Sequence, residues 1–229
     1  MNDMALIVPS RGRPNNIERL YGALKRTESL VDLHVGIDSD DPEISKYAEV
    51  AFGKDDLKLI VSEKRERFGP TLNRISVSIC DDYDYLAWMG DDHLPITKHW
   101  DQRYREELDN GAGIVYGNDL IMGQSIATQL AFTPDIVRAL GRALPEDFIH
   151  LYIDNYFMVL GDQIGGSVYL EDVIVQHLHP VAGRAEEDLT YREANSKENW
   201  SNDKRVFEEY IIHELPNDIE KIEYYRGQK

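Results

Sequence analysis

The sequence is poor in cysteine, in long apolar runs and in basic residues, and each shortage excludes a class of protein. Cys80 is the only cysteine among 229 residues, so the chain has no internal disulfide and fits a reducing compartment. No apolar run reaches the length of a membrane-spanning helix, and the apolar residues 4–8 are too few for a signal peptide. We therefore expect a cytoplasmic protein without a membrane partner.

Basic residues are scarce. The chain has 25 lysines and arginines but 42 aspartates and glutamates, which gives a formal net charge of −17. This charge opposes non-specific binding to DNA or to an anionic membrane, because both partners are negative. Positive charge does cluster locally, at Arg11 and Arg13 and at Lys64, Arg65 and Arg67, and each cluster lies a few residues after an expected strand. These clusters are either a phosphate-binding site at strand ends or solvated loop charges.

Several common catalytic signatures are missing as well. The sequence has no G-x-G-x-x-G or Walker-type loop, which counts against dinucleotide-binding and NTPase activities. It has no G-x-S-x-G segment and no plausible cysteine nucleophile, so hydrolysis through a serine or cysteine lacks support.

The first half of the chain alternates short apolar segments with segments of helical periodicity. This alternation predicts an α/β domain whose central sheet is mostly parallel and carries helices on both faces. Expected strands cover residues 5–8, 33–37, 57–61 and 85–89, and expected helices begin near residue 15 and cover 44–52 and 71–79.

The second half of the chain is less regular. Thr133, Pro134 and Asp135 form a typical helix start, with a capping hydroxyl, an early proline and an acid on the helix dipole. We assign residues 1–200 to one domain and 201–229 to a C-terminal amphipathic helix and tail packing on it, with 214–229 loosely attached. Other expected segments are strands at 113–116 and 168–175, a helix at 145–160 and a polar loop at 183–204.

Acids and histidines follow two of the expected strands. Asp91, Asp92 and His93 follow the apolar residues 85–89 after a single glycine, at the edge where open α/β sheets bind ligands. Adjacent carboxylates favour a hard divalent cation, although a solvated turn is the alternative. His177 and His179 are two residues apart and would share one side of a strand. Either could complete a metal site, or each could be a structural histidine bonded to a backbone carbonyl.

Two further acids are candidates for chemistry. Asp154 lies in the apolar and aromatic residues 151–157, where desolvation would raise its pKa toward that of a general base. The alternative is a helix acid paired with Arg138 or Arg142. Asp38 ends an expected strand and could accept hydrogen bonds from a ribose or a base, or it could be a turn acid.

Taken in order, these segments resemble the GT-A glycosyltransferases, the nucleotide-sugar-dependent enzymes built on one α/β domain. The similarity covers residues 5 to about 180 and is greatest to the short type encoded by bacteriophages. A strict D-x-D motif would need an acid at Met89 or Gly90, so which of Asp91 and Asp92 touches metal is open. The matching segments are residues 7–14 at the first strand and loop, 36–41 at the second strand, 89–93 at the metal region, 153–157 at the base motif, and the late His177.

The resemblance implies a nucleotide-sugar donor, most simply a UDP-sugar, with Mn2+ or Mg2+ as cofactor. It implies Asp154 as the base of an inverting transfer, and residues 183–204 as a lid over the donor. If the protein is viral, it would work in the host cytoplasm, on a hydroxyl of modified viral DNA, a virion protein or a glycan. The implied ligands are Asp91, Asp92 and His177 for the metal and Pro9, Ser10, Arg11, Arg13, Asp38, Arg65, Arg67, Asn73 and Asp91 for the nucleotide sugar.

Other functions compete with transfer. Asp91, Asp92, His177 and His179 could instead form a metal-dependent phosphohydrolase or nuclease, which would hydrolyse its substrate without a sugar acceptor. A sugar nucleotidyltransferase would need a glycine-rich loop with a lysine, which this sequence lacks. A third possibility is a non-catalytic virion protein that binds a nucleotide sugar.

Overall fold

The central sheet has eight strands in the order β3-β2-β1-β4-β7-β6-β8-β5 in a computed structural model that describes residues 2–179, 192 and 196–228. The pairings make six strands parallel to one another, whereas β5 and β7 run the opposite way. The expectation of a mostly parallel sheet is confirmed. The strands are β1 (Met4–Pro9), β2 (Val31–Asp38), β3 (Leu57–Ser62), β4 (Tyr85–Trp88), β5 (His93–Pro95), β6 (Ile114–Asn118), β7 (Leu130–Phe132) and β8 (Ser167–His177).

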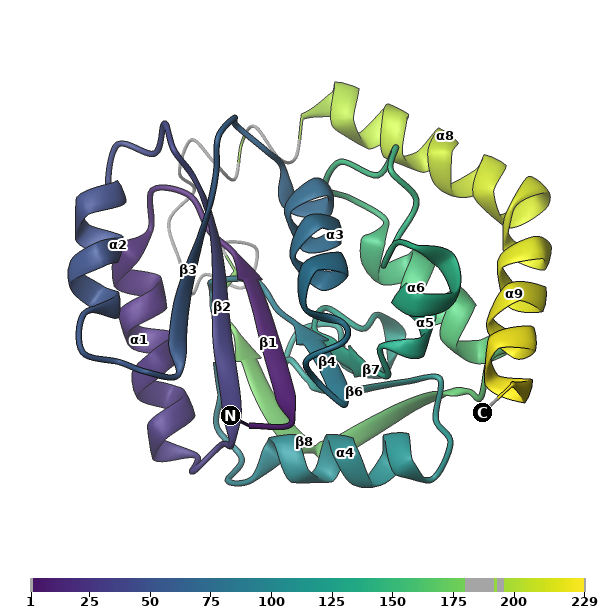
Figure 1. The fold of residues 1–229 in the computed structure, drawn as a ribbon, viewed down its shortest axis with the longest axis horizontal. Helices are drawn as coiled ribbons and strands as arrows, with labels where there is room; N and C mark the ends of the chain where they lie inside the picture. The colour runs from purple at the N-terminus through teal and green to yellow at the C-terminus, as the bar shows by residue number, and fades with distance from the viewer. Residues whose placement is uncertain (1, 180–191, 193–195, 229) are drawn as a thin grey trace.

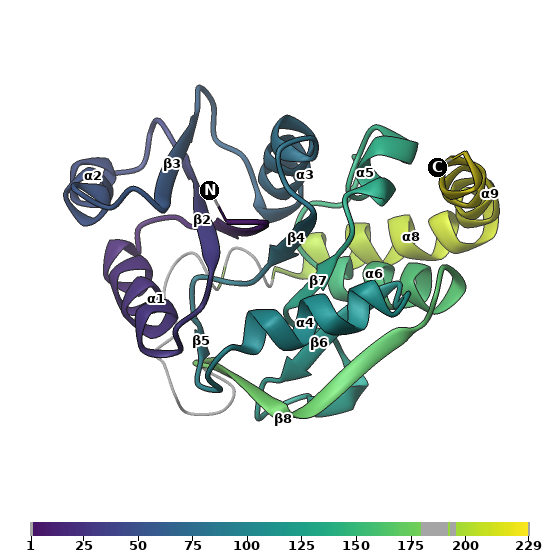
Figure 2. The same cartoon turned by 60° about the horizontal axis from the view of Figure 1, so that its bottom comes forward.

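Helices cover both faces of the sheet, as the sequence predicts (Figures 1 and 2). Alternate residues of β1 belong to two different hydrophobic clusters, because successive side chains of a strand point to opposite faces. One face carries α1 (Pro14–Arg26), α2 (Ile44–Ala51) and α4 (Trp100–Asp109); the other carries α3 (Phe68–Ile79), α5 (Asp135–Leu140), α6 (Ile153–Gln163), α8 (Lys197–His213) and α9 (Leu215–Gly227).

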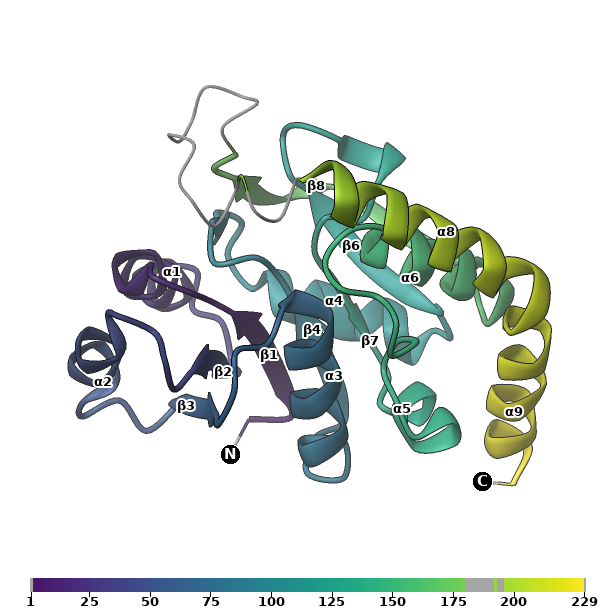
Figure 3. The same cartoon turned by 90° about the horizontal axis from the view of Figure 1, so that it is seen from above.

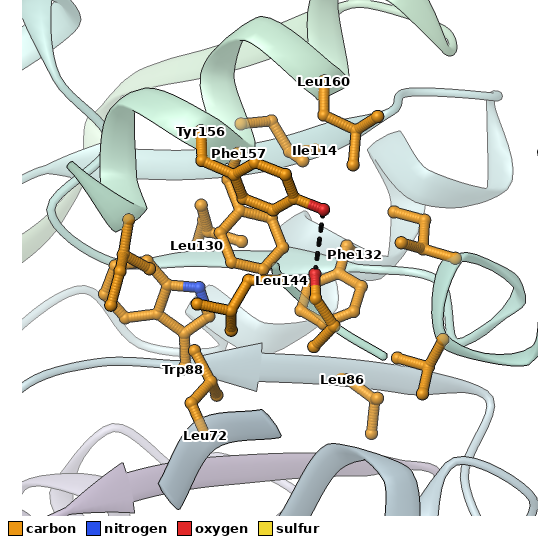
Figure 4. Close-up of a cluster of buried hydrophobic side chains, with 14 of the residues drawn as sticks. Leu72, Leu86, Trp88, Ile114, Leu130, Phe132, Leu144, Tyr156, Phe157 and Leu160 are labelled. Atoms are coloured by element: carbon orange, nitrogen blue, oxygen red, sulfur yellow. Dashed lines mark hydrogen bonds between the residues drawn. The ribbon is translucent and has the colours of Figure 1, made fainter. Parts of the chain in front are cut away.

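The second face holds the larger aromatic core (Figure 4). Trp88 from β4 packs near Phe157 from α6, with ring centroids 6.0 Å apart. Phe132 from β7 contacts the same phenylalanine at 5.1 Å. The hydroxyl of Tyr156 donates a 3.1 Å hydrogen bond to the carbonyl of Ala143, so this buried polar group is satisfied. The core thus fixes the end of β4 against the start of α6.

The expected helix over residues 145–160 is wrong in its first half. Helix α6 begins only at Ile153, after an irregular segment that ends at Tyr152, whose φ is 62°. The backbone N–H groups of residues 149–151 donate to the buried carboxylate of Asp203 in α8, so they are satisfied without a helix. This partner is about fifty residues away in sequence, and local periodicity carries no sign of it.

The C-terminal region also differs from the prediction. Residues 197–204, assigned to a polar loop, belong to α8, and most of residues 183–196 lie outside the described part of the chain. The tail is not loosely attached, because α9 buries Leu215, Asp218 and Ile222. Helix α8 runs beside α6, and α9 turns down beside α5 (Figure 3).

The carboxyl ends of the six parallel strands open at one edge of the sheet. The strand order reverses between β1 and β4, so the loops after these two strands leave the sheet in opposite directions. A crevice at such a point is the usual ligand-binding place of an open α/β sheet. The acids and arginines singled out in the sequence follow these strand ends.

Candidate active site

A cavity of about 310 Å³ opens at this edge. Its wall is formed by the loops after β1, β2, β3 and β4, by the end of β8 and by the segment that enters α6. Most of the candidate residues line it together: Pro9, Ser10, Arg11, Arg13, Asp38, Arg65, Arg67, Asp91, Asp92, Asp154, His177 and His179.

Asn73 is the one candidate that the structure does not bring to the cavity wall. Its amide oxygen accepts hydrogen bonds from the backbone N–H of Ala143 and Leu144, and its amide nitrogen donates to the carbonyl of Leu144. Asn73 therefore ties α3 to the chain that precedes α6.

Asp92, His93 and His177 form a tight group of possible metal ligands, whose donor atoms lie within 4.8 Å of one another. His93 and His177 are direct partners in the antiparallel pairing of β5 with β8, and their rings stack with centroids 4.0 Å apart. Asp92 Oδ1 lies 3.3 Å from His93 Nδ1, and Asp92 Oδ2 lies 3.4 Å from His177 Nε2. His179 contacts the His177 ring edge-on at 4.8 Å.

The charges of this group are strongly perturbed. Burial alone would raise the pKa of Asp92, but the neighbouring His177 and His93 hold it well below its usual value. Burial alone would lower the pKa of His177, whereas Asp119 and Asp92 raise it to about 9. The pKa of His93 is lowered, chiefly by burial. Asp92 is thus an anion flanked by imidazoles, a mixture of ligands that suits Mn2+ and related ions.

Two observations support the fit of a cation to these residues. His93 Nδ1 is buried and makes no hydrogen bond within the described part of the chain. This nitrogen lies 3.3 Å from Asp92 Oδ1 and is available to bind a metal ion. Gly90 leaves a space that any other residue would fill, because a Cβ there would lie 2.7 Å from Asp92 Oδ1 and 3.0 Å from His93 Nδ1. The donor set and the open space around it fit a divalent ion.

Asp91 points away from this group. Its Oδ2 accepts a 2.6 Å hydrogen bond from the hydroxyl of Ser10, and its Oδ1 forms a 3.1 Å ion pair with Arg13. Burial raises the pKa of Asp91, against the effect of Arg13. The adjacent acids therefore have different surroundings: Asp92 faces the histidines, and Asp91 holds the loop after β1.

Asp38 at the end of β2 is also held in place. Its Oδ2 pairs with Arg11 at 2.8 Å, and its Oδ1 accepts the backbone N–H of Glu66 at 2.9 Å. Arg11 makes a second ion pair with Asp40, which raises the pKa of its guanidinium. One carboxylate thus connects the loops after β1, β2 and β3, and brings the two arginine clusters of the sequence to one cavity.

Asp154 occupies the first turn of α6 and also lines the cavity. Burial raises its pKa, and the only opposing effects are backbone hydrogen bonds, including the 2.9 Å bond from Asn155 N–H. The alternative pairing with Arg138 or Arg142 is wrong, because Arg138 pairs with Asp81, and Arg142 pairs with Asp218 and Glu214. No described residue forms an ion pair with Asp154.

Several residues of the site were not found from the sequence. Thr128 and His150 line the cavity, and the buried Asp119 faces His177 from the end of β6. Burial lowers the pKa of His150 to about 4, so this imidazole is neutral near pH 7. Only Asp119 carried a signal, because it closely follows the expected strand 113–116, as Asp91 follows its own strand.

No protein-family model matches this sequence, and no curated protein matches it either. Solved structures do match. S. aureus TarS 1–349 in complex with UDP aligns with TM-score 0.60 at 13% identity, over 76% of this chain and 59% of that one. This chain thus spans less than two thirds of the TarS fragment.

A second neighbour is the mannosyltransferase PcManGT from Pyrobaculum calidifontis, in complex with GDP-Man and Mn2+. It aligns with TM-score 0.61 at 12% identity, over 99% of this chain and 74% of that one. In the described residues, no helix is long and apolar enough to cross a membrane.

The two structural matches show that this chain has the fold of the GT-A nucleotide-sugar glycosyltransferases.

Proposed function

We propose that this protein is a metal-dependent glycosyltransferase that moves a sugar from a UDP-sugar to an acceptor hydroxyl with inversion. The observation that carries the proposal is that a single cavity at the carboxyl edge contains both the Asp92–His177 group and Asp154. The fold supports it, because UDP and GDP-Man with Mn2+ are bound by proteins of the same fold.

The nucleotide would be held by the loops after β1, β2 and β3. Pro9 and Ser10 line this part of the cavity, and Asp38 offers its carboxylate to a base or a ribose. The arginines at 11, 13, 65 and 67 lie around it, and guanidinium groups match phosphate oxygens in geometry and charge. An anionic diphosphate bound among these arginines would explain why positive charge is concentrated here in a protein of net charge −17.

Asp92 and His177 would hold Mn2+ or Mg2+, with His93 Nδ1 available beside them. A bound cation offsets the negative charge that builds on the departing diphosphate. Asp91 acts differently in this proposal: it fixes Ser10 and Arg13 in the loop that contacts the nucleotide. The resemblance had implied both acids as metal ligands, and the contacts of Asp91 favour Asp92 alone.

Asp154 would take the proton from the acceptor hydroxyl as its oxygen attacks the anomeric carbon. Its raised pKa suits a base that must gain a proton near neutral pH. Attack from the side opposite the diphosphate inverts the anomeric centre. If the protein belongs to a bacteriophage, the acceptor is a glycan, a virion protein or modified DNA in the host cytoplasm, and the net charge of −17 disfavours DNA.

A screen of nucleotide sugars for thermal stabilisation tests the proposal, with each compound measured with Mn2+, with Mg2+ and with neither. We expect a UDP-sugar to raise the melting temperature only when a cation is present. The selected donor is then incubated with candidate acceptors, and NMR of the product gives the anomeric configuration. No metal-dependent shift with any nucleotide sugar would contradict the proposal, and phosphate release without an acceptor would favour the phosphohydrolase.

A further inference from the structure

Asp119 is a buried carboxylate next to the proposed metal ligands that the function above does not use. It directly follows β6, and 1% of its surface is exposed. Its Oδ1 accepts three backbone hydrogen bonds of 2.7–3.0 Å, from the N–H groups of residues 121, 122 and 123. The carboxylate is therefore fixed by the chain turn that follows β6.

The second oxygen, Asp119 Oδ2, faces the site. It accepts a 3.0 Å hydrogen bond from the hydroxyl of Thr128, and His177 Nδ1 lies 3.9 Å from it. Because the only hydroxyl proton of Thr128 points to this carboxylate, Thr128 Oγ1 can only accept from His93 Nε2, which lies 3.4 Å away. Asp119 and Thr128 thus face one nitrogen of each histidine.

A histidine must be neutral to bind a cation, and in that state these contacts favour one tautomer of each ring. A proton on His93 Nε2 leaves the lone pair on Nδ1, which is the buried atom without a hydrogen bond. A proton on His177 Nδ1, directed at Asp119, leaves the lone pair on Nε2. These two nitrogens are the ones that lie 3.3 and 3.4 Å from the oxygens of Asp92. Both nitrogens that keep a lone pair then lie beside the carboxylate of Asp92, in a group whose ligand atoms lie within 4.8 Å of one another.

We propose that Asp119, with Thr128 as its relay, is the positioning residue that sets both histidine tautomers and so makes His93 a metal ligand alongside Asp92 and His177. The inference rests on the metal site of the proposed function and adds the residues that orient its histidine ligands. Outer carboxylates that orient metal-bound histidines commonly change metal affinity by 10- to 100-fold when removed.

The test measures Mn2+ binding to the full-length protein by electron paramagnetic resonance, without any nucleotide. Asp119→Asn keeps an oxygen for the backbone N–H groups but places an amide near the histidines. We expect its Mn2+ dissociation constant to rise about 10- to 100-fold. Asp203→Asn is the matched control, because Asp203 also accepts three backbone N–H groups but from residues 149–151. Its Mn2+ affinity should stay within about twofold of the wild type.

Thr128→Val provides a second, near-isosteric test if Asp119→Asn does not fold. It removes only the hydroxyl that links Asp119 to His93, and we expect Mn2+ affinity to fall about tenfold. A role restricted to folding would lower the melting temperature in both variants and leave the dissociation constant unchanged, which would overturn the inference.

The outcomes separate this inference from the proposed function. A wild-type protein that binds no Mn2+ would overturn both. Wild-type binding that Asp119→Asn and Thr128→Val leave unaltered would overturn only the inference. Weakened binding in these variants, in a protein that transfers no sugar, would support the inference and contradict the function.

Discussion

Asp91 and Asp92 are adjacent in sequence, yet the structure gives them separate surroundings. Asp92 lies between two histidines, whereas Asp91 accepts a hydrogen bond from Ser10 and forms an ion pair with Arg13. The sequence predicts that both follow a buried strand, but it leaves open which of them faces a metal. That choice depends on the pairing of β5 with β8, which brings His93 opposite His177. Side-chain direction after a strand is set by such long-range partners.

Replacing Asp154 by asparagine tests the proposed base. The variant keeps the size of the side chain but cannot take up the acceptor proton. We expect turnover to fall on the order of a hundredfold or more while donor affinity stays nearly unchanged. Asp162→Asn is the control, because it lies in the same helix with an exposed side chain and should keep full turnover. Equal turnover of the wild type and Asp154→Asn would remove Asp154 from this role.

Gly90→Ala tests the space beside the metal ligands. The added Cβ would meet Asp92 Oδ1 at 2.7 Å and His93 Nδ1 at 3.0 Å, so at least one donor atom must move. We expect Mn2+ affinity, measured by titration calorimetry, to fall at least about tenfold. Gly227→Ala, whose Cβ meets nothing within 4 Å, is the control. Wild-type affinity in Gly90→Ala would show that these atoms do not bind the ion.

At the scale of elements, the strands and helices with clear periodicity were predicted well, and the short or tertiary-dependent ones were not. Strands β5 and β7 have three residues each, too few for a periodic signal. The apolar residues of segment 145–152 predict a helix. Its backbone instead bonds to Asp203 of α8, and local propensity cannot reveal this distant partner.

The C-terminal helix α9 is an integral part of the core in this structure, which a single substitution tests. Ile222 is fully buried in the cluster shared by α3, α5 and α6. We expect Ile222→Ala to lower the free energy of unfolding by about 2–4 kcal/mol, measured by urea denaturation. Tyr224→Ala, two residues away with 71% of its surface exposed, should change it by less than about 0.5 kcal/mol. Equal effects of both would mean that α9 is a loose tail.

At the scale of the whole molecule, the sequence predicts the α/β architecture. It also predicts that the candidate acids, arginines and histidines meet at one edge of the sheet. The parallel strands made this possible, because residues that follow parallel strands must meet at the same edge. The sequence could not place Asn73, which binds the backbone before α6 instead of lining the cavity. It also gave no sign of the Thr128 contacts, since Thr128 follows no predicted strand.

The stability of the molecule should fall in mild acid. Burial lowers the pKa of His34 to about 4, and its ring contacts the hydroxyl of Tyr83 at 2.9 Å. Between pH 6.5 and 4 the unfolded chain binds a proton that the folded His34 does not, so stability present above pH 6.5 is lost as the pH falls. We expect His34→Gln to reduce the loss between pH 7 and 5 by on the order of 1–2 kcal/mol. An unchanged pH dependence of urea unfolding would contradict a neutral buried His34.

The most direct measurement is anomalous X-ray diffraction at the manganese edge from crystals grown with UDP and MnCl2. We predict a peak at Asp92 and His177, with the diphosphate beside it and the uridine toward Asp38. UDP bound in the cavity with no peak at these two residues, or a manganese ion bound elsewhere in the molecule, would contradict the site.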